Sequence, residues 1–94
     1  MYFITVTEDF NFFENEYKDS RCWGYYNDLK TAKDVISRDS SMEETIYDYL
    51  VIEKVEEGIY PTIKEVAWYE WSEEKWVEIN KPEQFYRVCN WALS

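Results

Sequence analysis

Hydrophobic and polar positions predict five short β-strands: residues 2–7 alternate with a period of two, and the other stretches are rich in aromatic and β-branched residues between polar segments. The middle stretch is the strongest: Leu50-Val51-Ile52 is apolar on both faces, which indicates a central place in a sheet. The last two stretches flank a short polar loop at residues 72–75 and predict a β-hairpin. The five predicted strands are residues 2–7, 20–26, 47–55, 66–71 and 76–79.

Other segments repeat apolar residues at helical spacing. The clearest helix begins after Asn27 or Asp28, which favour the N-cap position, ends near Arg38, and buries Leu29, Ala32, Val35 and Ile36. Two shorter elements are predicted at residues 9–18 and, from the capping box Ser41/Glu44, as a helical turn from Met42. The final helix begins at the capping box Asn80/Glu83, holds Pro82 in its first turn, and carries the stripe Phe85, Val88, Cys89 and Ala92.

These elements predict a single domain over residues 1–94 with an α+β fold, in which a mainly antiparallel sheet of about four or five strands carries two or three helices on one face. In the hairpin, pairing of Trp71 with Trp76 sets the register. One face then carries Val66, Trp68, Val77 and Ile79, and we expect it to be the core side. The other face carries Tyr69, Trp71, Trp76 and Glu78, and we expect it to face water.

Charge and composition exclude several classes of function. The chain holds 20 Asp and Glu against 10 Lys and Arg, a net charge of −10, so phosphate backbones and anionic membrane surfaces would repel it. A hydrophobic content of 46% and an aromatic content of 20% exclude a disordered acidic tail. No apolar run is long enough to span a bilayer, and the first residues do not resemble a signal peptide, which predicts a cytoplasmic protein.

The residue types also limit the chemistry. There is no histidine and there are two glycines, Gly24 and Gly58, which exclude histidine-based catalysis and metal sites as well as glycine-rich phosphate loops. Carboxylate chemistry, as in a glycosidase, remains open to an enzyme. No spacing selects two particular acids and a domain this small rarely encloses such a cleft, so we expect no enzyme activity, no cofactor and no metal. Cys22 and Cys89 are expected to be reduced thiols, and the pattern does not tell whether they are close.

Two groups of residues are candidate binding sites. The first is the exposed hairpin face with its carboxylates, because an aromatic patch rimmed by polar groups marks partner-binding surfaces. The second places a guanidinium beside three aromatic rings, which can stack a base and hold a phosphate. The partner-binding residues are Tyr69, Glu70, Trp71, Glu73, Glu74, Trp76 and Glu78, and the alternative ligand-binding residues are Arg21, Trp23, Tyr25 and Tyr26.

Plain structural explanations stand beside both candidates. Cross-strand aromatic pairs also stabilise a hairpin, a second layer could cover the aromatic face, and residues 20–26 could be an ordinary strand with Gly24 at a bulge. The many carboxylates could serve only solubility, although the charge of −10 exceeds the magnitude of about 2–8 that suits a small domain.

Several motifs together resemble a family of small acidic proteins from phages, prophages and mobile elements of Firmicutes, whose function is unassigned. The shared motifs, in chain order, are residues 21–26, Leu29 with Ala32, residues 49–61, residues 68–71 and residues 81–83. The chain ends in Ala92-Leu93-Ser94, whereas members of that family often end in a small residue and glycine. The resemblance covers the chain from about residue 20 onward and carries over no catalytic or binding residue.

The resemblance implies a phage context in a bacterial host, where small acidic proteins without enzyme signatures often inhibit defence systems. We expect a non-enzymatic, anti-CRISPR-like inhibitor that mimics DNA and binds the basic groove of a host defence protein, a nucleic-acid-binding effector, without binding nucleic acid or membrane itself. The alternative is a sponge that sequesters a cyclic or other nucleotide second messenger, with its pocket completed across a homo-oligomer interface.

Overall fold

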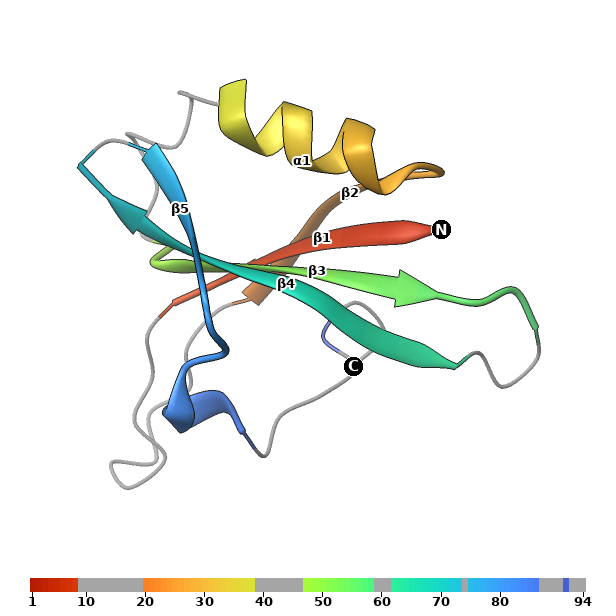
Figure 1. Ribbon diagram of the computed structural model, residues 1–94. Coiled ribbons are helices and arrows are strands. Elements are labelled where there is room, and N and C mark those ends of the chain that lie inside the picture. The colour runs from red at the N-terminus through yellow and green to blue at the C-terminus, as the bar shows by residue number, and fades with distance from the viewer. Residues whose placement is uncertain (9–19, 39–46, 59–61, 74, 87–90, 92–94) are drawn as a thin grey trace.

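A five-stranded antiparallel sheet forms the frame of the protein (Figure 1). The computed structural model describes residues 1–8, 20–38, 47–58, 62–73, 75–86 and 91. The strands lie in the order β2-β1-β3-β4-β5, and every neighbouring pair is antiparallel. Their bounds are β1 Tyr2–Thr7, β2 Ser20–Tyr26, β3 Tyr49–Val55, β4 Ile63–Ser72 and β5 Lys75–Ile79. All five predicted strands are confirmed.

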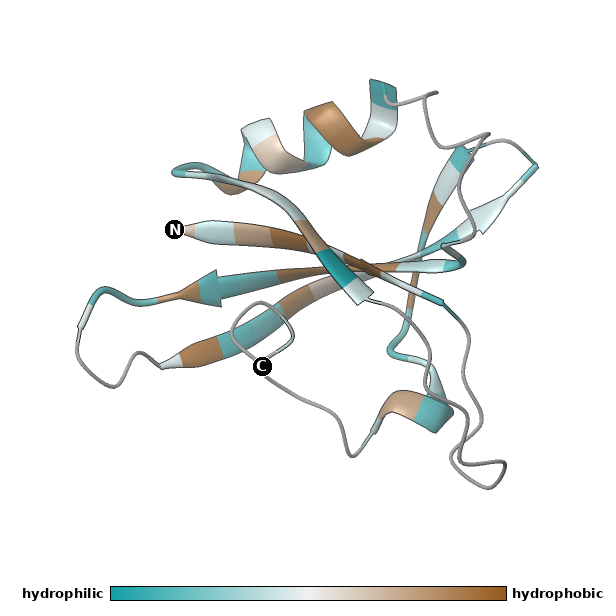
Figure 2. Ribbon diagram, turned by 180° about the vertical axis from the view of Figure 1, so that it is seen from behind, coloured by the Kyte–Doolittle hydropathy of each residue, from teal (hydrophilic) through white to brown (hydrophobic). Residues whose placement is uncertain are grey.

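Strand β3 lies at the centre of the sheet and is buried on both faces. Leu50 and Ile52 point to one face and Val51 and Glu53 to the other, and all four are fully buried. Hydrophobic residues colour the middle of β1 and β3 in Figure 2. The prediction that Leu50-Val51-Ile52 occupies a central position is confirmed.

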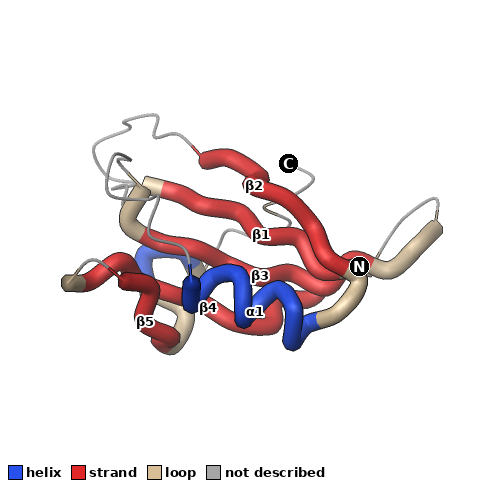
Figure 3. Tube along the Cα trace, turned by 90° about the horizontal axis from the view of Figure 1, so that it is seen from above, coloured by secondary structure: helices blue, strands red, loops and turns tan. Residues whose placement is uncertain are grey.

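Helix α1, Leu29–Arg38, covers one face of the sheet, which we call the helix face (Figure 3). Ala32 and Ile36 are buried against the strands, whereas Val35, predicted to be buried, is 39% exposed. The helix begins where the sequence indicates, because the Asp28 carboxylate accepts hydrogen bonds from the Thr31 hydroxyl and backbone N–H, both at 3.0 Å. These two bonds lower the pKa of Asp28.

The opposite face carries a second core built from aromatic side chains. The 3-10 helix η3, Glu83–Phe85, brings Phe85 onto Trp68, and the two rings stack at a centroid distance of 5.4 Å. Trp91 packs edge-on against both rings, at 5.5 and 5.3 Å. We call this side the C-terminal face. The sheet is therefore covered by chain on both sides.

The predicted fold class is wrong in its helices. The described residues are 55% strand and 20% helix, with a single α-helix on one face and only the short η3 on the other, instead of two or three helices on one face. The capping box Asn80/Glu83 does not form: Pro82 is the N-cap in an extended conformation, and no side chain caps the turn. The helix predicted at residues 9–18 and the turn from Met42 lie outside the described residues.

The hairpin register is confirmed, but the assignment of its faces is wrong. Trp71 pairs with Trp76, and Ser72 also pairs with Lys75, so the turn is shorter than predicted. Tyr69 and Trp76 are buried on the helix face, each 8% exposed.

The hairpin face predicted to be the core side is only partly buried. Trp68 is buried and Ile79 packs partly buried beside it, but Val66 and Val77 are exposed. A β-bulge causes the change at Val66, because it interrupts the pairing between Ile52–Ala67 and Glu53–Glu65 and so breaks the alternation along β4.

The packing of Phe85 on the C-terminal face can be tested by mutation. Phe85→Ala should lower the free energy of unfolding by about 3–5 kcal/mol, because it removes a fully buried ring from the Trp68–Trp91 cluster. Tyr86→Ala is the matched control: its side chain is 64% exposed, and its loss should cost less than about 0.5 kcal/mol. Urea denaturation measures both. Equal effects would show that η3 does not cover the sheet.

Candidate functional site

One end of the sheet gathers carboxylates at or beside the ends of three strands, of which Asp48, Glu70 and Glu73 are exposed and Glu8 is half-buried. At this end β1 stops, β3 begins and β4 stops, and the ladder places Thr7 opposite Tyr49 and Tyr49 opposite Glu70. The Asp48 backbone connects the strands: its N–H donates to Thr7 O at 3.0 Å and its carbonyl accepts from Trp71 N at 2.9 Å. We call this region the acidic end, with the carboxylates Glu8, Asp48, Glu70 and Glu73.

Glu70 and Glu73 of the acidic end take part in no ion pair between described residues. The ion pairs between described residues are Lys33–Glu78, Lys54–Glu56 and Lys81–Glu65, and none of them lies at the acidic end. Glu70 and Glu73 are exposed there. An exposed group of like charges produces a negative potential that reaches into solvent by about a Debye length.

The residues predicted to bind a partner do not form one surface. Glu70 and Glu73 are exposed at the acidic end, whereas Glu78 lies on the helix face and pairs with Lys33 at 3.2 Å. Tyr69 and Trp76 are buried and Trp71 is half-buried, with the two indoles edge-on at 5.2 Å. Glu74 lies outside the described residues. The aromatic members of the predicted surface are thus part of the core.

Tyr69 has an altered ionisation. Burial raises the pKa of its phenol to about 12, and the nearby Glu78 carboxylate contributes by charge repulsion and by accepting a hydrogen bond. The neutral phenol is therefore the form that suits the core between α1 and the hairpin.

The alternative ligand-binding residues, on edge strand β2, divide between two faces. Arg21 and Tyr26 pair with Val6 and Tyr2 and share the helix face with them. Tyr25 pairs with Phe3 on the opposite face, where their rings pack at 5.6 Å.

Trp23 occupies the bulge of β2, where the pairing with β1 shifts between Ile4 and Thr5, and lies edge-on to Trp76 at 6.5 Å. A Cβ on Gly24 would meet nothing within 4 Å, so close approach does not demand glycine there. Cys22 is an exposed free thiol, and Cys89 lies outside the described residues.

Sequence reasoning missed a carboxylate pair on the C-terminal face. Glu53 and Glu65 are directly opposite each other in the ladder, and Glu53 is fully buried. Glu65 accepts hydrogen bonds from the indole N–H groups of Trp68 at 3.1 Å and Trp91 at 3.3 Å.

Two further contacts complete this cluster. Lys81 Nζ pairs with Glu65 at 3.0 Å, and Glu53 accepts from the Trp91 backbone N–H at 3.0 Å. Donors of the same chain therefore occupy both carboxylates. No spacing in the sequence pairs these two residues, since the register depends on the bulge at Val66.

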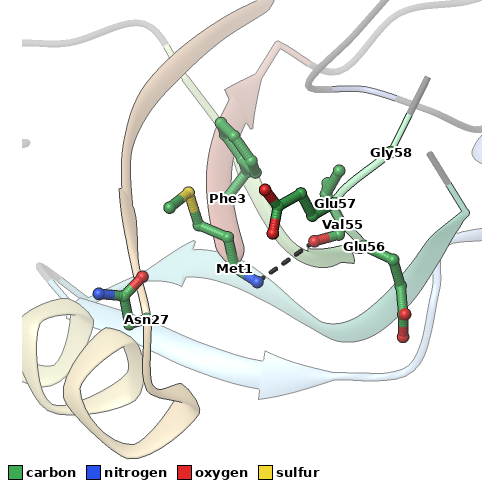
Figure 4. Close-up of a pocket in the computed structure, with 7 residues that line it drawn as sticks. All are labelled: Met1, Phe3, Asn27, Val55, Glu56, Glu57 and Gly58. Carbon is green, nitrogen blue, oxygen red and sulfur yellow. Dashed lines mark hydrogen bonds between the residues drawn. The ribbon is translucent and has the colours of Figure 1, made fainter. Parts of the chain in front are cut away.

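A cavity of about 540 Å³ lies at the end of the sheet opposite the acidic end (Figure 4). Apolar side chains and two carboxylates line it, and the backbone N of Met1 donates to Val55 O at 3.2 Å beside it. None of the predicted site residues lines this cavity. Its lining residues are Met1, Phe3, Asn27, Val55, Glu56, Glu57 and Gly58.

Two searches within the described residues gave negative results. They contain no group of three His, Cys, Asp or Glu residues that could hold a metal ion. None of the helices there is long and apolar enough to cross a membrane. In comparisons with known proteins, no family model, curated protein or solved structure matches the chain.

The contacts that Glu65 makes with Trp68, Trp91 and Lys81 can be tested by measuring the free energy of unfolding of a variant. Glu65→Ala should lower the free energy of unfolding by about 2–4 kcal/mol, because two indole donors and the Lys81 ammonium lose their acceptor. Glu70→Ala on the same strand is the control, since Glu70 is exposed, and should change it by less than about 0.5 kcal/mol. If chemical denaturation gives equal losses for Glu65→Ala and Glu70→Ala, these contacts do not stabilise the fold.

The ionisation of Tyr69 gives a pH prediction. Its folded pKa of about 12 exceeds the ordinary value of 10.0, so its contribution to stability is complete below pH 10 and is lost as the pH rises towards 12. Ultraviolet titration of the phenols should show one late-ionising group, absent in Tyr69→Phe and shifted to lower pH in Glu78→Gln. If Tyr69→Phe removes a group that titrates near pH 10, the burial of Tyr69 is wrong.

Proposed function

We propose that this chain is a non-enzymatic, phage-type counter-defence protein that acts in the cytoplasm of the bacterial host. It binds the basic groove of a nucleic-acid-binding defence protein, such as a CRISPR effector, and occupies the place of DNA. The observation that carries the proposal is the acidic end, where Glu70 and Glu73 are exposed and have no ion pair with any described residue.

The physical basis is the similarity of a carboxylate array to a phosphate backbone. Neighbouring strands lie about 4.8 Å apart, so Glu8 after the end of β1, Asp48 before the start of β3 and Glu70 on β4 follow one another at short intervals across the sheet. A groove lined by Lys and Arg attracts such an array as it attracts phosphates, and long-range attraction speeds encounter. A net charge of −10 supplies this attraction.

The burial of the hairpin aromatics changes the expected contact. Tyr69 and Trp76 are each 8% exposed, so they hold α1 against the sheet and are not anchors for a partner. Binding in this proposal depends on carboxylates, chiefly Glu70 and Glu73 among the predicted residues. The nucleotide-sponge alternative has less support at its predicted residues, because Tyr25 lies on the opposite face of the sheet from Arg21 and Tyr26.

A charge-neutralising pair tests the proposal. Glu70→Gln with Glu73→Gln should weaken binding to a purified CRISPR effector at least roughly tenfold at about 0.1 M salt and reduce the protection of phage in plaque assays. The matched control is Glu56→Gln with Glu57→Gln, which removes the same charge from two exposed residues at the opposite end of the sheet. The control should bind within about twofold of the unmodified chain.

Salt dependence gives the second arm of this test. Affinity should fall steeply between about 0.1 and 0.5 M salt, because screening shortens the reach of the acidic end. Binding that is unchanged across this range, or equal loss in both double variants, would refute DNA mimicry. A chain that protects phage from no defence system of its host would refute the counter-defence role.

A further inference from the structure

A groove of about 470 Å³ lies on the helix face, at the end of the sheet opposite the acidic end. It lies beside the start of helix α1, with Leu29 on one side and strands β1, β3 and β4 on the other. Two lysines, two hydroxyl groups and apolar side chains line it. The lining residues are Tyr2, Leu29, Lys54, Glu56, Thr62, Lys64, Glu65 and Val66.

The two lysines occupy directly opposed positions of the sheet. Lys54 of β3 pairs with Lys64 of β4, and Tyr2 of β1 pairs with Lys54 from the other side. Like charges at opposed positions destabilise a sheet. In a chain with twice as many acids as bases, this pair places two of ten cations where they repel each other.

Neighbouring carboxylates compensate this repulsion only in part. Glu56 approaches Lys54 at 3.9 Å, and both side chains are largely in solvent. Lys64 has no ion pair among the described residues. Glu65 borders the groove, but both oxygens of its carboxylate are engaged by Trp68, Trp91 and Lys81 on the other face of the sheet. With Glu65 held by Lys81, the groove presents two ammonium groups against the one carboxylate of Glu56.

We propose that this groove binds a nucleotide, with the phosphate between Lys54 and Lys64 and the base against Tyr2. A phosphate dianion matches two ammonium groups, and the Thr62 hydroxyl adds a further hydrogen-bonding group. The half-buried ring of Tyr2 offers an aromatic surface of the kind on which bases stack. The volume lies within the range of about 300–1,000 Å³ typical of small-ligand sites.

This site is independent of the proposed function. It uses none of the carboxylates of the acidic end and none of the residues Arg21, Trp23, Tyr25 and Tyr26. Loss of nucleotide binding and loss of effector binding can therefore be separated by the variants that cause them.

Calorimetric titration with AMP, adenosine and inorganic phosphate tests the site. AMP should bind at least roughly tenfold more tightly than either fragment, because only AMP engages the lysines and Tyr2 together. Lys54→Gln with Lys64→Gln should reduce AMP affinity at least roughly tenfold. The control, Arg38→Gln with Lys75→Gln, removes the same charge from exposed residues near the acidic end and should leave AMP affinity within about twofold.

Thermal unfolding separates a binding role of the lysines from a structural role. Without ligand, the Lys54/Lys64 variant should melt at the same or a higher temperature than the unmodified chain, since the substitution relieves repulsion. The proposal is overturned if AMP does not bind at about 10 mM, or if both double variants lose affinity equally. It is also overturned if inorganic phosphate binds as tightly as AMP, which would leave Tyr2 without a role.

Discussion

The burial of β3 on both faces is the constraint on which the rest of the structure depends. Leu50 and Ile52 require a layer on one side, and Val51 and Glu53 require one on the other, since all four are fully buried. Helix α1 supplies the first layer, and Phe85 with Trp91 supplies the second. Glu53 adds a further requirement, because its buried carboxylate needs a hydrogen-bond donor. It accepts a hydrogen bond from the Trp91 backbone N–H, and this bond connects Trp91 to the central strand.

The strand patterns and the Asp28 cap predicted their elements well, because those signals lie within a few neighbouring residues. The apolar run Leu50-Val51-Ile52 indicated the central strand, and Asp28 indicated the start of α1. The faces of the hairpin were not predictable, since Trp68 and Trp76 are equally apolar and both faces became cores. In the predicted C-terminal helix, the described residues form only the 3-10 turn Glu83–Phe85, in which Phe85 stacks on the distant Trp68, whereas Val88, Cys89 and Ala92 lie outside the described residues.

The two-sided core also explains why the chain is both acidic and aromatic. Aromatic side chains such as Trp68, Trp76 and Tyr69 fill the cores, and most of the described carboxylates, apart from the buried Glu53, face solvent. Sequence reasoning found Glu70 and Glu73, but the chain fold alone brings them to the end of the sheet where Glu8 and Asp48 lie. The opposed lysines Lys54 and Lys64 likewise depend on register beyond the bulge at Val66, which no local pattern reveals.

Native-state hydrogen exchange tests the two-sided burial of β3 most directly. The backbone amides of Leu50, Val51 and Ile52 lie between two paired strands and under two cores, so they should exchange most slowly and only through global unfolding. Amides of the edge strand β2, such as that of Tyr25, should exchange through smaller openings. Exchange of the β3 amides as fast as those of β2 would contradict this account of the fold.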